Sequence, residues 1–257
     1  MPIITLTSDW GLKDHYLAAV KGSILSSLPG ANIVDISHQV EPFDLKQAAF
    51  LVRNTYPHFP KGSVHIISIQ SEETTQYSHV AVEIEGQFFI GNDNGIFPMI
   101  FDRLPDKIIE MNIPHDTDKF TFPTRDRFIK AAVHLLKGSA IEELGHPKAI
   151  WSEQILFKPV ISGNVIKGII IYVDNYENVV TNITEELFNA QVKGRKFLIE
   201  CRGESIASIS QSYLDVPMGE PLALFSSTGN LEIAINQGKA SSLLGLYMSD
   251  PVRVEFF

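Results

Sequence analysis

The sequence has little of what several classes of protein require. Among its 257 residues only Cys201 is a cysteine, which excludes an internal disulfide and a cysteine-based metal cluster. The longest apolar run, IIIYV at positions 169–173, is far too short to cross a bilayer. Lys and Arg number 21 against 30 acidic residues, a net charge of −9 that argues against a nucleic-acid surface. We therefore expect neither a membrane nor a nucleic acid as partner.

Targeting signals and common cofactor motifs are also missing. The N-terminus MPIITLTSDW has no basic stretch followed by a long apolar run, so we expect no signal peptide and a cytoplasmic protein. The histidines show no metal-ligand spacing such as H-x-x-x-H, and no P-loop, G-x-G-x-x-G or G-x-S-x-G motif occurs. We expect no metal site and no cofactor.

What the sequence does contain is typical of a globular chain. Hydrophobic residues make up 44%, enough for the core of one large or two medium domains. In the first part, apolar runs that predict strands alternate with periodic segments that predict helices. Strands are expected at residues 3–6, 32–36, 64–69, 80–84 and 88–90, and helices at 16–28, 45–56 and 125–137. This order predicts an α/β domain with a mostly parallel sheet.

Local signals support two of these helices and the hairpin. A buried stripe along the first helix is indicated by apolar residues at every fourth position: Tyr16, Val20, Ile24 and Leu28. Asp44, followed three positions later by Gln47, predicts the start of the second helix with an approximate capping box. The turn at residues 85–87 predicts an antiparallel hairpin.

After about residue 150 the pattern changes to short strands separated by turns. A single short helix is expected after Thr184, a typical N-cap. Strands are expected at residues 163–173, 196–201, 205–210, 221–225, 231–234 and 252–256. Strands and turns at this spacing predict a small β-barrel domain. We place the domain boundary so that residues 1–155 form the α/β domain and residues 156–257 the β-barrel domain.

The segment TLTSDWGLKDHYLAAVKG, residues 5–22, predicts a strand that ends at Asp9, a turn at Gly11, and a helix preceded by Asp14. In open α/β sheets, small-molecule sites form beyond the carboxyl ends of the strands. Asp9 could accept two vicinal hydroxyls there, or it could only cap the next turn. Asp14 could contact a ligand, or its negative charge could simply be stabilised by the positive N-terminal end of the helix dipole.

Two further segments carry clustered polar residues. DNYENVVTNI at residues 174–183 and SSTGNLEIAINQG at residues 226–238 each follow an apolar strand. Taken alone, both could be turns whose side chains bond the local backbone. Together with residues 5–22, however, they resemble the S-adenosylmethionine (SAM) hydroxide adenosyltransferases, relatives of the fluorinase and chlorinase. The resemblance extends along nearly the whole chain, so it implies a nucleoside-binding first domain.

The resemblance also implies roles for individual residues. Asp9 would hold the ribose hydroxyls of SAM, and Asp174 would bind the methionine ammonium. Tyr176 would stack on adenine, while Asn178 would bond the adenine edge, for which an amide offers both a donor and an acceptor. Further substrate contacts are implied for Asp14, for Phe43 in the segment PFD, and for Thr121, Ser227, Asn236 and Gln237.

The same resemblance fails at the catalytic residues. Hydrolytic members use an Asp-Arg-His set to orient or activate water. Here Gln70 stands in place of the aspartate, Tyr77 in place of the arginine and Pro123 in place of the histidine, with Thr124 in place of a neighbouring glycine. We take Gln70, Tyr77 and Thr124 as the candidate catalytic residues. They could hold a water but cannot readily take its proton at neutral pH.

The expected function is hydrolysis of SAM to adenosine and L-methionine by attack at the 5′ carbon, weakened by these departures. The alternative is a non-catalytic or altered binder of SAM or adenosine, which the missing set favours. A third reading is a halide-using 5′-halogenase with Thr124 near the halide, but the extra loop of the halogenating relatives has no room here. The resemblance further implies a homotrimer whose ligand lies between subunits.

Overall fold

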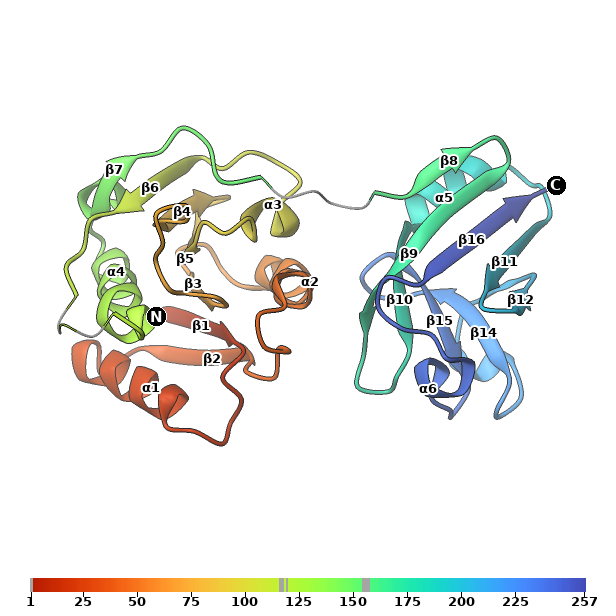
Figure 1. The fold of residues 1–257 in the computed structure, drawn as a ribbon, viewed down its shortest axis with the longest axis horizontal. Helices are drawn as coiled ribbons and strands as arrows, with labels where there is room; N and C mark the ends of the chain where they lie inside the picture. Colours follow the sequence, from red (N-terminus) through yellow and green to blue (C-terminus); the bar gives the residue numbers. More distant parts are fainter. Residues whose placement is uncertain (1, 116–117, 119, 154–157) are drawn as a thin grey trace. The chain divides into compact units, whose positions relative to one another are not determined.

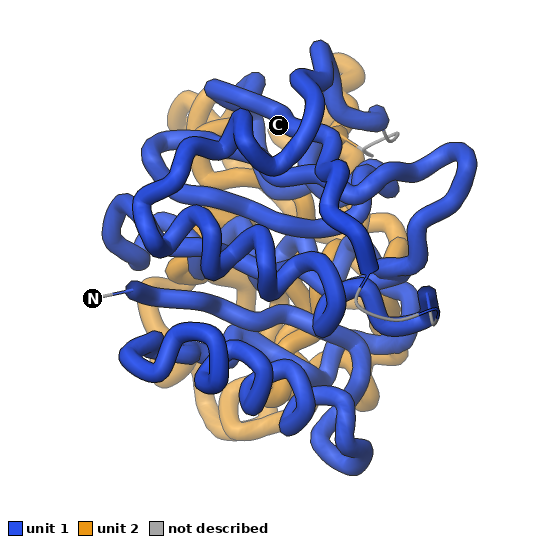
Figure 2. Tube along the Cα trace, turned by 90° about the vertical axis from the view of Figure 1, so that its left-hand side faces the viewer, with its two compact units in different colours: residues 1–154 blue, residues 155–257 orange. Residues whose placement is uncertain are grey.

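A computed structural model of the chain describes residues 2–115, 118, 120–153 and 158–257 (Figure 1). The chain divides into two compact units, residues 1–154 and residues 155–257, coloured separately in Figure 2. Each unit has its own sheet and its own core. In the described part of the chain, no helix is both long enough and apolar enough to cross a membrane.

Unit 1 is built on a seven-stranded sheet with the order β2-β1-β3-β5-β4-β6-β7. Its strands are β1 (Ile3–Ser8), β2 (Asn32–Ser37), β3 (Val64–Ser68), β4 (His79–Ile84), β5 (Gln87–Asn92), β6 (Lys107–Met111) and β7 (Gly145–Pro147). Strands β2, β1, β3 and β5 pair in parallel, and β6 runs in the same direction beyond the antiparallel β4. The predicted α/β domain with a mostly parallel sheet is therefore confirmed.

Helices cover both faces of this sheet. They are α1 (Tyr16–Ser27), α2 (Leu45–Thr55), η1 (Tyr56–His58), α3 (Phe97–Ile100), η2 (Thr124–Phe128), α4 (Ile129–Leu136) and η3 (Ile141–Leu144). One core packs α1 and α4 against the face that includes Ile66, and the other packs α2 and α3 against the face that includes Ile67. Strand β3 is buried on both sides, as its continuous apolar sequence predicts.

Two local predictions in unit 1 can be checked in detail. Asp44 does cap α2, since its Oδ1 accepts the backbone N–H groups of Lys46 and Gln47 at 2.9 and 3.0 Å. The capping box was wrong in its second half: the Gln47 side chain accepts the N–H of Glu41 instead of that of Asp44. The chain before α2 is thereby tied back to the helix, and this chain carries Phe43.

Unit 2 has a nine-stranded sheet in the order β12-β11-β16-β9-β10-β15-β14-β13, with β8 paired to β9. Its strands are β8 (Val160–Ser162), β9 (Val165–Val173), β10 (Val179–Thr184), β11 (Phe197–Cys201), β12 (Glu204–Ile206), β13 (Ile209–Ser210), β14 (Pro221–Phe225), β15 (Asn230–Ile235) and β16 (Pro251–Phe256). Figure 1 shows the sheet curled into a half-barrel. The second domain is therefore built on a β-sheet, as predicted. This sheet curls but does not close into a full barrel.

Short helices complete unit 2: α5 (Glu185–Val192), η4 (Tyr213–Asp215) and α6 (Ala240–Leu244). The predicted cap is present, because the Thr184 hydroxyl accepts the N–H of Leu187 at 3.2 Å. Two predicted strands differ in their bounds. The strand predicted at residues 163–173 begins at Val165, because Gly163 lies in a turn that separates β8 from β9. The strand predicted at residues 205–210 is interrupted between β12 and β13.

Candidate functional site

Three neighbouring strands of unit 1 end at the same edge of the sheet. Because β1, β3 and β5 are parallel and adjacent, the residues that follow Ser8, Ser68 and Asn92 lie along one edge. This is the edge at which open α/β sheets bind small molecules. Two predicted site residues lie there: Asp9 directly follows β1, and Gln70 comes two residues after the end of β3.

Asp9 serves the fold and still leaves an oxygen for a ligand. Its Oδ2 accepts the N–H of Phe43 at 2.9 Å. Phe43 has a φ of +69°, which is unusual for a residue other than glycine, and its side chain is 66% exposed. Within the described residues, Asp9 Oδ1 accepts no hydrogen bond. Asp9 thus holds a residue 34 positions away instead of capping the next turn, and this contact is compatible with the ligand-binding interpretation.

A row of three hydrogen-bonded polar side chains, of which Ser8 and His38 are buried and Asp35 is exposed, lies beside Asp9. The Ser8 hydroxyl and His38 Nδ1 are 2.6 Å apart, and His38 Nε2 lies 3.1 Å from the Asp35 carboxylate. Burial acts to raise the pKa of Asp35, but the bonds from Lys21 and His38 outweigh it and lower that pKa. A Ser-His-Asp order is also that of a nucleophilic triad, yet Ser8 is only 1% exposed. We therefore conclude that the contacts among Ser8, His38 and Asp35 stabilise the end of β1.

The other predicted contacts of the opening segment are simpler. Gly11 makes the expected turn with a φ of +68°, and its N–H donates to the His38 carbonyl. Asp14 is exposed shortly before α1 and does not cap that helix. Phe122 packs edge-on against Trp10 at 5.4 Å between ring centroids, and Thr121 beside it is exposed.

The candidate catalytic residues differ in how accessible they are. Gln70 is exposed and has a φ of +47°, with its carbonyl accepting a bond from Asn92 Nδ2 at 2.9 Å. Tyr77 is half-buried, and its N–H donates to the Thr74 hydroxyl. Thr124 is fully buried, and its hydroxyl lies 2.8 Å from that of Ser68. Only Gln70 and Tyr77 therefore present surface to a bound molecule.

Thr124 opens η2, a π-helical turn that continues into α4. Such turns insert one residue into a helix and occur frequently at functional sites. Pro123 is buried at the start of this turn. The geometry of the turn therefore fixes positions 123 and 124 against the end of β3.

In unit 2, the segment after β9 forms the turn that its asparagines and aspartate predict. Asp174 Oδ1 accepts the N–H groups of Tyr176 and Asn178, each at 2.8 Å, and Asp174 Oδ2 accepts Asn178 Nδ2 at 3.2 Å. Tyr176, at the tip of the turn, is 74% exposed. Asn182 has a structural role, since its Oδ1 accepts the N–H of Ile169 across β9 and β10.

Glu177, in the same turn, connects it to residues that follow β15. It adopts a left-handed φ of +63°, which a glycine would take freely. Its carboxylate accepts bonds from Lys239 Nζ at 2.7 Å and from the Ser242 backbone N–H at 3.1 Å. These contacts tie the second predicted cluster to the residues that follow the third, which ends at Gly238.

The third cluster lies at the two ends of β15. Ser227 is exposed in the turn before this strand. Asn236 is buried after it and donates through Nδ2 to the Val216 carbonyl at 2.8 Å, while the exposed Gln237 has a φ of +54°. The Asn236 backbone is also committed to the fold, because its N–H donates to the Glu220 carbonyl at 3.1 Å and its carbonyl accepts from Gly219 at 2.8 Å.

The sequence analysis missed a buried carboxylate beside this cluster. Glu232 on β15 accepts the Tyr213 hydroxyl at 2.7 Å. Burial raises the pKa of Glu232, the bond from Tyr213 opposes this, and the charge of Asp174 raises the pKa further. A single charged residue inside the otherwise apolar strand LEIAI is the signal that could have identified it. Elsewhere, the described residues contain no group of three His, Cys, Asp or Glu that could hold a metal.

Comparison with known proteins gives these sites a context. The family model of the SAM hydroxide adenosyltransferase N-terminal domain matches residues 4–145, and that of the SAM hydroxide adenosyltransferase C-terminal domain matches residues 168–253. The chain belongs to the SAM hydroxide adenosyltransferase family. The resemblance seen in the sequence is therefore confirmed, and it includes both units.

Members of this family with known names or structures align over almost the whole chain. An (R)-S-adenosyl-L-methionine hydrolase of Thermus thermophilus is 30% identical over 96% of this chain and 97% of its own. A fluorinase of Actinoplanes is 25% identical over 91% of each chain. The crystal structure of an uncharacterized conserved protein from Thermotoga maritima superposes with a TM-score of 0.89, at 29% identity, and covers 98% of this chain and 99% of that one.

Proposed function

We propose that this protein binds SAM and hydrolyses it, at a low rate, to adenosine and L-methionine. The observation that carries the proposal is the Asp9 carboxylate, which follows β1 with Oδ2 on the Phe43 N–H and Oδ1 available to ribose hydroxyls. Full-length similarity to a protein named (R)-S-adenosyl-L-methionine hydrolase supports SAM as the substrate. Asp174, Tyr176, Asn178 and Ser227 are proposed to contact its methionine and adenine parts.

The chemistry demands little of the protein at the leaving group. A water oxygen attacks the 5′ carbon, the C5′–S bond breaks, and its electron pair converts the sulfonium into the neutral thioether of methionine. The attacking water loses one proton to solvent, so SAM and water yield adenosine, methionine and a proton. The protein contributes by holding the water in line with the C5′–S bond.

The rate is expected to be low because the candidate catalytic positions hold no base. Gln70 and Tyr77 can donate and accept hydrogen bonds to a water, but an amide and a phenol do not take its proton near neutral pH. The Thr124 hydroxyl is already bonded to Ser68. Losing a general base typically lowers a rate by about 10²–10⁴-fold. Positioning of substrate and water supplies the remaining catalysis.

Ligand binding without catalysis is the second candidate, and the burial of Thr124 favours it. If neither Gln70 nor Tyr77 orients a water, the same Asp9 and Asp174 clusters would still bind SAM or adenosine. The two functions therefore share their binding residues and differ only in the release of adenosine.

One experiment separates them. Purified protein is incubated with SAM, adenosine and methionine are followed by chromatography, and SAM affinity is measured by calorimetry for wild type and Asp9→Ala. The matched control is Asp102→Ala, which removes an exposed carboxylate that pairs with Arg53 in the last turn of α2. We expect slow adenosine release by wild type, and binding lost only in Asp9→Ala.

Each other result has a definite meaning. Tight binding with no adenosine above the uncatalysed rate would support the second candidate. A 5′-halogenated nucleoside formed on addition of chloride or fluoride would support halide chemistry instead. No binding by wild type, or equal binding by wild type and Asp9→Ala, would refute the proposal.

The assembly proposed for this function is a homotrimer in which residues of both units contact each ligand. The support is the family membership of both units and the separation of the predicted contacts into two sets. Light scattering at micromolar concentration tests it, and a monomer would contradict it.

A further inference from the structure

The loop between β3 and β4, residues 70–78, carries both accessible candidate catalytic residues, Gln70 and Tyr77. Most of its residues are exposed, so little apolar burial holds it in place. An exposed loop of this length would ordinarily sample many conformations. Its conformation must therefore be fixed by polar contacts if Gln70 and Tyr77 are to meet a substrate in one geometry.

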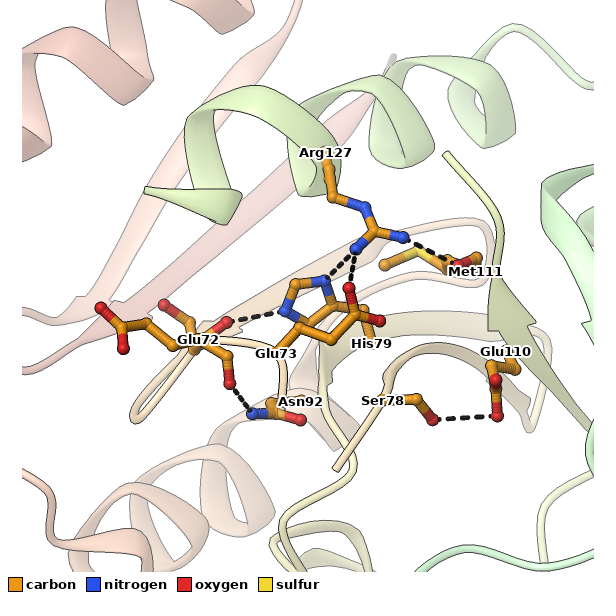
Figure 3. A network of polar contacts seen from close by, with 9 residues as sticks. Glu72, Glu73, Ser78, His79, Asn92, Glu110, Met111 and Arg127 are labelled. Carbon is orange, nitrogen blue, oxygen red and sulfur yellow. Dashed lines mark hydrogen bonds and ion pairs between the residues drawn. The ribbon is translucent and has the colours of Figure 1, made fainter. Parts of the chain in front are cut away.

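The strongest of these contacts comes from Arg127, which is only 5% exposed, in η2. Its Nη1 donates to the Glu73 carboxylate at 2.5 Å and to His79 Nδ1 at 3.0 Å, and its Nη2 donates to the Met111 carbonyl at 2.9 Å (Figure 3). A buried guanidinium is costly unless it is paired. Among the described residues its carboxylate partner is Glu73, in the loop.

His79 connects Arg127 to a second residue of the loop, Ser71. Because Nδ1 accepts from Arg127, the ring proton lies on Nε2, which donates to the Ser71 carbonyl at 2.7 Å. Burial, with the charge of Arg127, lowers the pKa of His79 to about 4, although the bond to Ser71 opposes this. The ring is therefore neutral and keeps this tautomer at neutral pH.

Asn92, buried at the end of β5, holds the same stretch from the other side. Its Nδ2 donates to the carbonyls of Gln70 and Glu72 at 2.9 and 2.8 Å. Together with the His79 bond, three consecutive carbonyls, 70 to 72, are fixed. These contacts hold Gln70 in its left-handed conformation, which an unrestrained glutamine would rarely adopt.

We propose that Arg127 is a positioning residue for the reaction: through Glu73 and His79 it fixes the 70–78 loop so that Gln70 and Tyr77 meet the substrate. This inference rests on the proposed function. Arg127 itself is buried and touches no substrate. Its removal should therefore change turnover while leaving the ribose contact at Asp9 intact.

The variant to test is Arg127→Met, which keeps an unbranched apolar stem in the buried space. Glu73, whose side chain is 41% exposed, can then turn to solvent and is not left as an unpaired buried charge. We expect kcat to fall by about 10²-fold, the effect typical of a small misplacement of catalytic groups. We expect the affinity for adenosine to stay within about twofold, because adenosine is held by Asp9.

Two further variants separate positioning from stability. Arg127→Lys keeps the buried charge but lacks the planar fork, so it should restore resistance to denaturant without restoring kcat. Arg53→Met removes an exposed arginine that pairs with Asp102 in the same unit and should change neither kcat nor loop dynamics. Hydrogen exchange of peptides from residues 70–78 should accelerate in Arg127→Met and remain unchanged in Arg53→Met.

The outcomes distinguish this inference from the proposed function. If wild type releases adenosine and Arg127→Met, folded and binding adenosine, keeps its kcat, the inference is wrong. If wild type releases none, the proposed function fails, and the loop is judged by SAM affinity and hydrogen exchange. Unchanged values of both in Arg127→Met would then overturn the inference, and faster exchange with weaker SAM binding would uphold Arg127 as a positioning residue for the ligand.

Discussion

All eight histidines and both tryptophans lie in residues 1–154, and residues 155–257 contain neither type. In unit 1, site residues are held by side chains distant in sequence, as Ser68 holds Thr124 and Arg127 holds Glu73. In unit 2, Asp174 and Asn178 bond each other within one turn. The comparison teaches that the candidate site residues of unit 1 are held by tertiary contacts, whereas many of those in unit 2 are held by local ones.

Buried titratable side chains in the two units should also respond oppositely to acid. Burial lowers the pKa of His65 to about 4, although its bond to Gln87 opposes this, and the pKa of His79 is lowered to about 4 as well. In unit 2, burial raises the pKa of Glu232. Because a buried histidine with a lowered pKa takes up a proton less readily than it does in the unfolded chain, the folded unit loses stability as the pH falls from 6.5 toward 4. A raised glutamate pKa contributes stability that is lost as the pH rises.

The largest expected effect comes from restoring a catalytic set in unit 1. The triple change Gln70→Asp, Tyr77→Arg and Pro123→His should raise adenosine release by about 10²–10⁴-fold, because it supplies a base and its partners together. Aspartate tolerates the left-handed backbone of position 70. Pro123 is the most demanding position, since it is buried and its replacement adds an N–H.

The assay compares wild type and triple variant at equal folded concentration, with Gln70→Asp alone as the control that adds a carboxylate without its partners. A wild type as fast as the triple variant would contradict the expectation. It would show that Gln70, Tyr77 and Thr124, or another residue, already activate the nucleophile.

The acid sensitivity of unit 1 gives the next largest effect. His65 is fully buried, with Nδ1 at 2.8 Å from the Thr5 hydroxyl and Nε2 at 2.7 Å from Gln87. Lowering the pH from 7 to 4.5 should cost unit 1 about 2–3 kcal/mol through this group, and His65→Gln should remove that part of the loss. Urea titrations followed by tryptophan fluorescence measure it, because both tryptophans report on unit 1.

The matched control is His58→Gln, which replaces an exposed histidine and should leave the loss unchanged. Equal pH dependence in wild type and His65→Gln would show that the buried ring does not govern the acid sensitivity of unit 1.

A smaller effect is expected from the local contacts of unit 2. Asp174→Ala removes the acceptor of three hydrogen bonds and should destabilise unit 2 by about 1–3 kcal/mol. Hydrogen exchange in peptides from β10 should accelerate, while tryptophan fluorescence of unit 1 stays the same. An equal loss of stability in both units would show that they unfold as one. It would contradict the view that the contacts of Asp174 act locally within unit 2.

The smallest effect is expected for Glu177→Gly. Glycine suits the φ of +63° but loses the bonds to Lys239 and Ser242, so the free energy of unfolding should change by less than about 1 kcal/mol. The control is Glu185→Gly, in the first turn of α5, where glycine has no such advantage and should destabilise more. If Glu177→Gly lowers the free energy of unfolding more than Glu185→Gly does, the hydrogen bonds of the Glu177 side chain stabilise the fold by more than its backbone strain destabilises it.

Features that depend on residues close together in the sequence were predicted correctly more often than features that depend on distant residues. The strand that ends at Asp9, the turn at Gly11, the caps Asp44 and Thr184, and the Asp174 turn were all predicted, because each depends on residues a few positions apart. The expected capping box failed because Gln47 bonds Glu41 instead, a choice set by how the chain approaches α2. Strands β6 and β7 were missed, because short strands at the far side of a sheet carry little periodic pattern.

By itself, the sequence determined the α/β and all-β halves, the family, and the absence of the Asp-Arg-His set, since periodicity and residue identity are local properties of the chain. Only the tertiary structure decided that Thr124 is buried against Ser68, that Asp9 accepts the N–H of Phe43, and that Arg127 contacts a loop 54 residues earlier through Glu73. These contacts depend on which strands lie side by side, and no spacing in the sequence encodes a pair of charges that only the folded sheet brings together.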